Sequence, residues 1–262
     1  MKLEDWWPWY EKIAKIFYLN PAEDQRAADL LSSIIGKRAA HLEDLRRKVE
    51  GRPVIIFGAG PSLEENLGEA LKVIDRFEWC IVSADGATTA LMKANLTPEL
   101  IVTDLDGRIK DILEAQKAGA LTVIHAHGDN IEALKGYLPV FHGEMVGTTQ
   151  VQPRLGVYNF GGFTDGDRCA FLAEALDAVL IVLAGMDLGS VVGKYSKPHL
   201  EADSPAWEAK RKKHQIAKEL LSWLSKHSRM KILNATGCGE KIWGVPNIRF
   251  ENLARWRNLT VS

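Results

Sequence analysis

The chain has 262 residues, of which 46% are hydrophobic, and its 33 basic and 34 acidic side chains leave a formal net charge of −1. This length and composition suffice for one large core, and the near-zero charge excludes broad electrostatic binding to nucleic acid or to an anionic membrane. Three cysteines far apart, Cys80, Cys169 and Cys238, form neither a disulfide framework nor a CxxC zinc pair, so a reducing, cytoplasmic location is expected.

Residues 1–50 are charged and favour helices, with apolar positions at helical spacing on both sides of Pro21, which divides two predicted helices. The opening residues lack the basic-then-apolar order of a secretory signal. Trp6, Trp7 and Trp9 are predicted to pack against the protein or to form an interface, and these helices would suit a homodimer contact. The segment is expected to be an amino-terminal helical appendage.

From Pro53 onward, short apolar runs alternate with amphipathic stretches, which is the pattern of βαβ units. Residues 51–262 are therefore predicted to form an α/β catalytic domain with a mostly parallel sheet and helices on both faces. The longest apolar run, residues 178–186, is about half of the ~20 residues of a membrane-spanning helix and is read as a buried strand. The predicted strands are 54–57, 80–83, 100–103, 121–124, 155–158 and 179–183, followed by a helix over 207–226 and a strand near Ile232.

Polar loops follow several of these strands, and in an open parallel sheet such loops share one crevice. In the first loop, Gly58, Gly60, Pro61 and Ser62 precede a helix, so backbone N–H groups there would hold a phosphate and Ser62 would cap the helix. A plain tight turn is the alternative, because glycine also serves that purpose. The loop is not a P-loop, since no Gly-Lys-Ser/Thr follows.

Carboxylates end the second and third strands. Asp104 and Asp106 stand one residue apart directly after an apolar strand, where both can face one side of an extended segment. Oxygen ligands of this kind suit Mg²⁺ that also contacts substrate phosphates. Asp85, followed by Gly86, is either a helix cap or a nucleotide contact. The third strand end therefore predicts a magnesium site.

The fourth loop, residues 125–130, contributes His125, His127 and Asp129. The spacing does not match a zinc site, although two histidine ligands with Asp129 remain an alternative.

The fifth loop contains Phe163, Thr164, Asp165 and Asp167 before an amphipathic helix. Either acid is a helix cap, or the aromatic and the acids recognise a flat heterocycle with amino and amide groups.

Basic residues follow the last long strand. Lys194 and Lys197 lie just after a strand end, where they would neutralise phosphate charge. The run 210–213 (Lys-Arg-Lys-Lys) is read first as a solvated helix face.

Taken in order, the motifs Gly-Ala-Gly-Pro-Ser-Leu, Ala-Asp-Gly-Ala, Thr-Asp-Leu-Asp-Gly, His-Ala-His-Gly-Asp-Asn and Gly-Phe-Thr-Asp-Gly-Asp-Arg resemble the archaeal 6-hydroxymethyl-7,8-dihydropterin pyrophosphokinase family. The resemblance runs from about residue 51 to 224. It implies Mg²⁺-dependent transfer of diphosphate from ATP to a reduced pterin, with release of AMP, in tetrahydromethanopterin or folate biosynthesis.

The family is itself similar to thiamine pyrophosphokinases, and that likeness implies a thiamine-pyrophosphokinase-like fold and individual roles. Asp85 and Gly86 match a nucleotide-binding Asp-Gly motif, Asp104 and Asp106 match a magnesium-binding pair, and Asp129 matches a third acid that completes the metal shell or accepts a proton. Thr103 and Gly107 around the pair, and a histidine at 125, depart from the pattern. The number of metal ions is therefore open.

Two other functions fit part of this pattern. A nucleotide-sugar glycosyltransferase, from related glycan-modifying proteins that share the early Gly-Pro-Ser loop, would use the same metal–diphosphate geometry with another acceptor. A nucleotide-binding regulatory protein would need only the first loops, and it would give no reason for acids on five strand ends.

Overall fold

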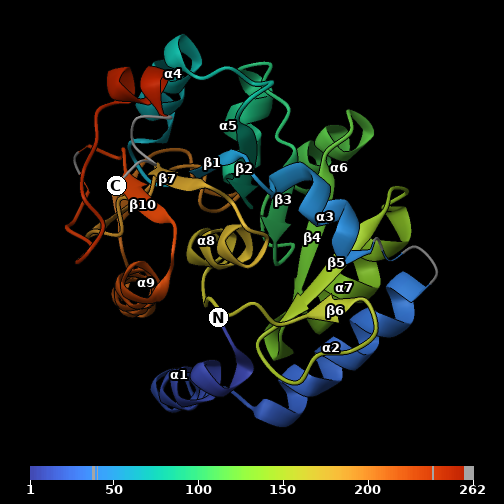
Figure 1. The fold of residues 1–262 in the computed structure, drawn as a ribbon. Coiled ribbons are helices and arrows are strands. Elements are labelled where there is room, and N and C mark those ends of the chain that lie inside the picture. Colours follow the sequence, from blue (N-terminus) through green and yellow to red (C-terminus); the bar gives the residue numbers. More distant parts are fainter. Residues whose placement is uncertain (37–38, 40, 238, 257–262) are drawn as a thin grey trace.

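The structure is a computed structural model that describes residues 1–36, 39, 41–237 and 239–256. In these residues one eight-stranded sheet has the order β10-β7-β1-β2-β3-β4-β5-β6, and all neighbouring strands are parallel (Figure 1). A small antiparallel pair, β8 and β9, lies outside it. The strands are β1 (Pro53–Phe57), β2 (Cys80–Ala84), β3 (Leu100–Thr103), β4 (Leu121–Ala126), β5 (Met145–Thr149), β6 (Val157–Tyr158), β7 (Leu180–Ala184), β8 (Val191–Val192), β9 (Ser204–Pro205) and β10 (Lys231–Asn234).

Helices cover both faces of the sheet. They are α1 (Leu3–Phe17), α2 (Pro21–Ile35), α3 (Leu42–Val49), α4 (Leu63–Val73), α5 (Ala87–Lys93), α6 (Ile109–Lys117), α7 (Ile131–Tyr137), α8 (Asp165–Ala175) and α9 (Glu208–His227), with 3-10 turns η2 (Gly128–Asn130), η3 (Leu138–Val140) and η4 (Phe250–Arg255). One face packs α1, α3, α8 and α9, and the other packs α2, α4, α5, α6 and α7. No helix in the described part of the chain is both long and apolar enough to cross a membrane.

The apolar composition of the strands follows from this double cover. Successive side chains of a strand point to opposite faces, so a strand covered on both sides must be apolar throughout. In β1, Val54 and Ile56 pack on the α8 side, whereas Ile55 and Phe57 pack on the α4 side. The predicted fold class, an α/β protein with a parallel sheet and helices on both faces, is confirmed.

The chain changes direction across the sheet at β1. From β1 it runs through β2, β3, β4 and β5 with α4 to α7 on one face, and α8, on the opposite face, then leads back to β7 beside β1. Right-handed crossovers require the helices to change faces when the direction reverses. The carboxyl ends of the strands around β1 and β7 therefore form the expected ligand crevice.

Two details differ from the sequence prediction. β5 (Met145–Thr149) was missed, because a short segment with glycine and two threonines carries no strong apolar run. The strand predicted at 155–158 is only Val157–Tyr158, since Leu155 is 88% exposed and lies in the turn before it.

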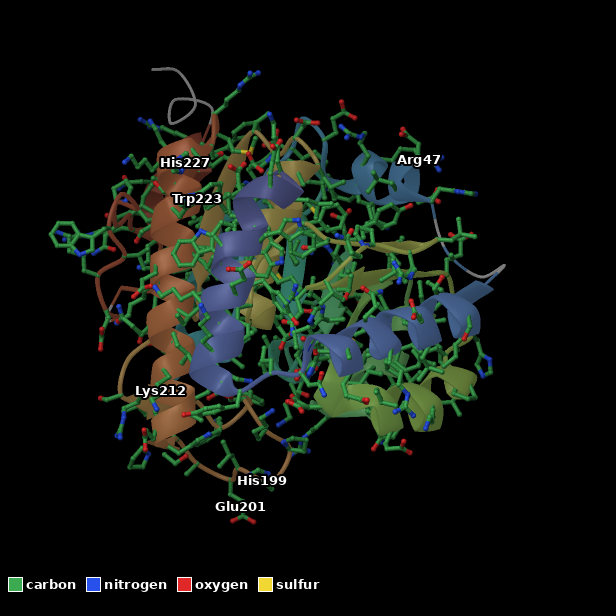
Figure 2. The ribbon with its side chains drawn as sticks, turned by 90° about the horizontal axis from the view of Figure 1, so that it is seen from below. Arg47, His199, Glu201, Lys212, Trp223 and His227 are labelled. Carbon is green, nitrogen blue, oxygen red and sulfur yellow. The ribbon has the colours of Figure 1, made fainter. Side chains whose placement is uncertain are left out.

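The amino-terminal helices share the core of the sheet. Trp6 is buried, and its indole N–H donates to the carbonyl of Gln150 at 2.8 Å, so Trp6 is a packing residue. α1 runs beside α9 (Figure 2), and Lys12 of α1 pairs with Glu219 of α9. α2 packs on β4, β5 and β6. The predicted domain boundary at residue 50 and the predicted homodimer stay predictions.

Candidate active site

A cleft of about 230 Å³ opens at the carboxyl ends of the strands. Several of its lining residues directly follow a strand: Gly58 follows β1, Asp85 follows β2, Asp104 follows β3, His127 follows β4 and Gln150 follows β5. Of the residues singled out from the sequence, those lining the cleft are Gly58, Gly60, Asp85, Gly86, Asp104, Asp106, His125, His127, Asp129, Phe163, Thr164, Asp165, Lys197, Lys210 and Lys213. Pro61, Ser62, Lys194 and Asp167 are not among its lining residues.

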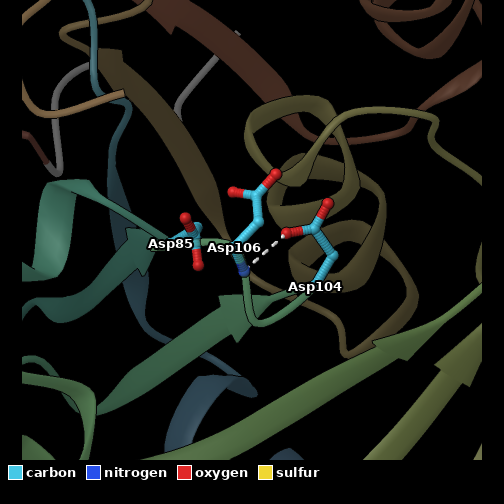
Figure 3. Close-up of side chains that lie close together, drawn as sticks. All are labelled: Asp85, Asp104 and Asp106. Carbon is cyan, nitrogen blue, oxygen red and sulfur yellow. Dashed lines mark hydrogen bonds between the residues drawn. The ribbon is translucent and has the colours of Figure 1, made fainter. Parts of the chain in front are cut away.

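Three carboxylates converge on one side of this cleft. Asp85, Asp104 and Asp106 each place one oxygen within 4.8 Å of the others (Figure 3), and we call them the three-carboxylate group. Leu105, between the last two, has φ +68°, and the N–H of Asp106 donates to Asp104 Oδ1 at 3.3 Å. Within the described residues, this is the cluster of acids, histidines and cysteines close enough to hold a metal ion. An all-oxygen donor set suits Mg²⁺.

Asp85 joins the group because its neighbours hold it there. The Thr103 hydroxyl donates to Asp85 and accepts the N–H of Leu105 at 2.9 Å, and the backbone of Gly107 also hydrogen-bonds to Asp85. A Cβ at Gly107 would lie 2.5 Å from Asp85 Oδ2, so glycine is needed at this position. Thr103 and Gly107, the two departures from the thiamine pyrophosphokinase pattern, therefore support the third carboxylate.

Burial and like charge shift the pKa values of the acids in this region. Burial, and then the neighbouring charge of Asp104, raise the pKa of Asp85 to about 6. Burial also raises the pKa of Asp104, but the nearby ring of His127 and the positive charge of Lys197 lower it overall. The pKa of Asp165 is raised well above its usual value by burial and by the same two acids. A divalent cation fits this arrangement, because it would relieve the mutual repulsion of the carboxylates.

The glycines after β1 allow this loop to pack closely against the loop after β7. The N–H groups of Gly58 and Gly60 donate to the carbonyls of Ala184 and Gly185. A Cβ at Gly60 would lie 2.0 Å from Asp187 Oδ2. The expectation that these two glycine N–H groups hold a phosphate is therefore wrong, and the tight-turn alternative describes them.

Ser62 does not cap the helix that follows the loop. Its hydroxyl donates to Asp187 Oδ2 at 2.9 Å, and α4 has no side-chain cap there.

Lysines from two segments face the acids. Lys197 pairs with Asp106, and Lys210 and Lys213 line the cleft from α9. Burial and the charges of Lys197 and Lys213 lower the pKa of Lys210 to about 8. Lys194 instead pairs with Glu64 at 2.7 Å and lines a separate pocket with Pro61.

The solvated face predicted for 210–213 is correct for three of the four residues, because Arg211, Lys212 and Lys213 are exposed. Lys212 is exposed and pairs with Glu208 at 2.7 Å (Figure 2), and Arg211 is exposed too. Lys210 is half-buried, and the exposed Lys213 lines the cleft beside it, because residues three apart share a side of a helix.

The two acids of the fifth loop, Asp165 and Asp167, have different positions: Asp167 caps α8, whereas Asp165 faces the cleft. The carboxylate of Asp167 accepts the N–H groups of Phe163 and Thr164, both at 2.8 Å, in a capping box at the start of α8. Asp167 is fully buried, so its predicted contact with substrate is wrong. Asp165 lines the cleft with Phe163 and Thr164.

The fourth loop lies against the three-carboxylate group. His127 Nε2 is 3.7 Å from Asp104 Oδ2, and its ring stacks on His125, whose pKa burial lowers well below the usual value. Asp129 is 85% exposed, and its nearest ionic partner is His127 Nδ1 at 3.9 Å. Asp129 is outside the three-carboxylate group, and its metal role stays a prediction.

Sequence reasoning missed several lining residues: Phe17, Leu19, Gln150, Asp187 and His214. Asp187 lies three residues after the end of β7, so the expectation that ligands bind at the carboxyl ends of the strands could have identified it. Gln150 follows the missed β5. Phe17 and Leu19 come from the amino-terminal helices and carry no local signal for a site.

Comparisons with known proteins place the chain in a family. The family model described as "6-hydroxymethylpterin diphosphokinase MptE-like" matches residues 29–193. A protein from Pyrococcus furiosus named 6-hydroxymethyl-7,8-dihydropterin pyrophosphokinase is 48% identical over 235 residues, which cover 89% of this chain and 98% of that protein. A protein of the same name from Methanothermobacter thermautotrophicus is 42% identical over 234 residues, covering 88% and 99%.

A solved structure supports the fold alone. The Maf glycosyltransferase from Magnetospirillum magneticum aligns over 88% of this chain with a TM-score of 0.51 and 14% sequence identity, and this chain spans 41% of it. The resemblance inferred from the five loops is confirmed by the family model and the curated relatives. The chain belongs to the MptE-like 6-hydroxymethylpterin diphosphokinase family.

Proposed function

We propose that this chain transfers diphosphate from ATP to the hydroxymethyl group of 6-hydroxymethyl-7,8-dihydropterin, depends on Mg²⁺ and releases AMP. The observation that carries the proposal is the three-carboxylate group opposite Lys197, Lys210 and Lys213 in one cleft. Diphosphoryl transfer needs positioning and neutralisation of phosphate charge above all, and this arrangement offers both. The product would serve tetrahydromethanopterin or folate biosynthesis.

The proposed reaction is a substitution at phosphorus. The hydroxymethyl oxygen bonds to the β-phosphorus of ATP, the bond from that phosphorus to the oxygen bridging toward the α-phosphate breaks, and AMP leaves with that electron pair. Mg²⁺ held by Asp85, Asp104 and Asp106 would neutralise phosphate oxygens. Lys197, Lys210 and Lys213 supply further positive charge from the facing wall.

The hydroxyl proton needs an acceptor. Asp129 is the candidate, because it lines the cleft, lies outside the three-carboxylate group and is solvent-exposed, so a proton passed to it can reach water. This favours the second of its two predicted roles over completion of a metal shell.

The acceptor ring is assigned to the Phe163 side of the cleft. A reduced pterin offers an amino group and a ring N–H side by side, and the Asp165 carboxylate accepts such donors in pairs. Phe163 adds an aromatic surface next to it.

The test is incubation with ATP, Mg²⁺ and a panel of acceptors, with AMP and ADP resolved by chromatography. We expect AMP in the presence of 6-hydroxymethyl-7,8-dihydropterin and none with thiamine or with pterin lacking the hydroxymethyl group. ADP as the nucleotide product would contradict diphosphate transfer. Release of a nucleoside diphosphate from a nucleotide sugar would support the glycosyltransferase alternative, and nucleotide binding without turnover of any acceptor would support a regulatory protein.

A further inference from the structure

The turn between α1 and α2 forms part of the cleft. Phe17, the last residue of α1, and Leu19 in the turn both line it, although they precede the first strand by more than thirty residues. The ring of Phe17 lies against that of Phe163, with centroids 5.0 Å apart and planes inclined by 43°. We call Phe17, Leu19 and Phe163 the apolar wall.

We propose that the apolar wall binds the acceptor ring, so that Phe17 is a specificity-determining residue for the acceptor. This inference rests on the proposed function and extends it to a segment outside the five strand-end loops. The two rings are too close together for a third ring to enter between them. The acceptor therefore packs on the surface that they present jointly.

The chemistry of the cleft distinguishes this wall from the phosphate end. Acids and lysines gather around the three-carboxylate group, where a triphosphate needs charge compensation. The ammonium of Lys213 lies 5.6 Å from the centre of the Phe163 ring, so the apolar wall directly adjoins the lysines of the cleft. A flat heterocycle gains most from an apolar surface beside a few polar groups.

Asp165 favours a pterin over adenine on this wall. It lies two residues after Phe163 and also lines the cleft. When ionised, its carboxylate has two acceptor oxygens and matches a pair of adjacent N–H donors, which a pterin presents and which in turn stabilise the ionised form. The adenine edge presents one donor next to an acceptor, so it pairs less well with a carboxylate.

Buried hydrogen bonds fix the turn in place. Asp24, on α2, is 2% exposed, and its carboxylate accepts the N–H of Gly128 at 2.7 Å, the amide of Gln150 at 2.8 Å and the hydroxyl of Tyr10 at 2.6 Å. Tyr10 is on α1, so this one carboxylate links both amino-terminal helices to the loops after β4 and β5. The wall is therefore built on packed helices rather than on a free terminus.

The experiment compares Phe17→Ala with Tyr18→Ala. Tyr18 is the next residue and is 92% exposed, so its truncation is a matched control. For Phe17→Ala we expect the KM for 6-hydroxymethyl-7,8-dihydropterin to rise about tenfold, from the loss of one aromatic packing partner, while the KM for ATP stays within about twofold. Tyr18→Ala should leave both values unchanged.

Phe17→Leu guards against loss of folding, because it keeps apolar volume and removes the aromatic ring. We expect it to unfold at the wild-type temperature and to show a smaller increase in the same KM. An unchanged pterin KM in a folded Phe17→Leu and Phe17→Ala would overturn the inference, as would a rise in the KM for ATP instead. Wild-type enzyme that forms no AMP with the pterin would contradict the proposed function itself, so the two failures are distinct.

Discussion

Asp85 illustrates how single residues build the site. Its φ of +40° is rare for a residue with a side chain, and the hydrogen bonds from Thr103 and Gly107 hold the carboxylate in place. The sequence predicted Asp104 and Asp106 because they are neighbours in the chain. Asp85 comes from another strand end, and it joins them only because Ala84 of β2 pairs with Val102 of β3, a register that no local motif encodes.

Replacing any member of the three-carboxylate group should lower kcat strongly and spare the fold. We expect Asp85→Asn, Asp104→Asn and Asp106→Asn each to lower kcat about 10²–10³-fold, because each removes negative charge where the proposed Mg²⁺ would meet the phosphates. The melting temperature should not fall, since the substitutions relieve repulsion between acids. AMP formation and thermal unfolding measure the two effects.

Asp5→Asn, an exposed position in the first turn of α1, is the control for loss of one charge. Asp129→Asn should keep metal binding and lose part of kcat. Near-normal AMP release by Asp104→Asn or Asp106→Asn would rule out the assignment.

The charge of Lys210 is expected to destabilise the folded protein at pH 7 and to contribute to ATP binding. The pKa of Lys210 is lowered from 10.5 to about 8, so at pH 7 the Lys210 side chain is protonated in both states, but the folded protein binds this proton more weakly than the unfolded chain does. Stability therefore rises with pH from about 8 to 10.5, as the folded protein releases this proton first. We expect Lys210→Met to raise the free energy of unfolding at pH 7 by roughly 1–3 kcal/mol and to weaken ATP binding.

Urea unfolding at pH 7 and pH 10.5, without nucleotide, measures the effect, which should shrink at the higher pH. Lys212→Met is the matched control, two positions away and exposed, and it should change neither stability nor KM for ATP. Equal behaviour of the two variants would show that Lys210 is solvated.

At the scale of elements, α2 is tied to the active-site loops through Asp24. We expect Asp24→Ala to lower the free energy of unfolding by about 1–3 kcal/mol, because the N–H of Gly128 and the amide of Gln150 lose a buried acceptor. The loop that carries His127 should loosen, and kcat/KM should fall about tenfold. Hydrogen exchange at the Gly128 amide reports on the loop directly.

Tyr10→Phe removes only the third hydrogen bond of Asp24 and should leave Gly128 protected. Asp29→Ala, on the exposed side of α2, controls for the helix itself. Unchanged protection of Gly128 in Asp24→Ala would mean that α2 does not position the loop.

The periodicity of apolar residues predicted most helices and strands, but fewer of the contacts between them. Apolar runs located β1, β2, β3, β4, β7 and β10, and helical spacing located α1, α2 and α9, because burial on one or two faces leaves a local pattern. The division of α9 into an outer face with Lys212 and a cleft face with Lys210 depends on what packs against it. The same reason separates Asp165 from Asp167, since both begin α8 and only the capping geometry tells them apart.

At the scale of the whole molecule, the order of the strands brings the residues of the cleft together. The reversal at β1 brings the loops after β1 and β7 together, while the run from β2 to β5 adds one polar loop after another along the same edge. The strand-end rule therefore predicted the crevice from sequence. It did not predict that the amino-terminal helices close the crevice, because their position depends on tertiary packing alone.

The fate of the β-phosphorus tests the central claim most directly. ATP labelled at that atom is incubated with the protein, Mg²⁺ and 6-hydroxymethyl-7,8-dihydropterin, and the label is followed by chromatography. We predict that the label moves to the pterin in equal amount to the AMP released, and that chelation of Mg²⁺ or Asp104→Asn stops the transfer. Label that stays in ADP, or appears as free phosphate independently of the pterin, would contradict diphosphate transfer at the three-carboxylate group.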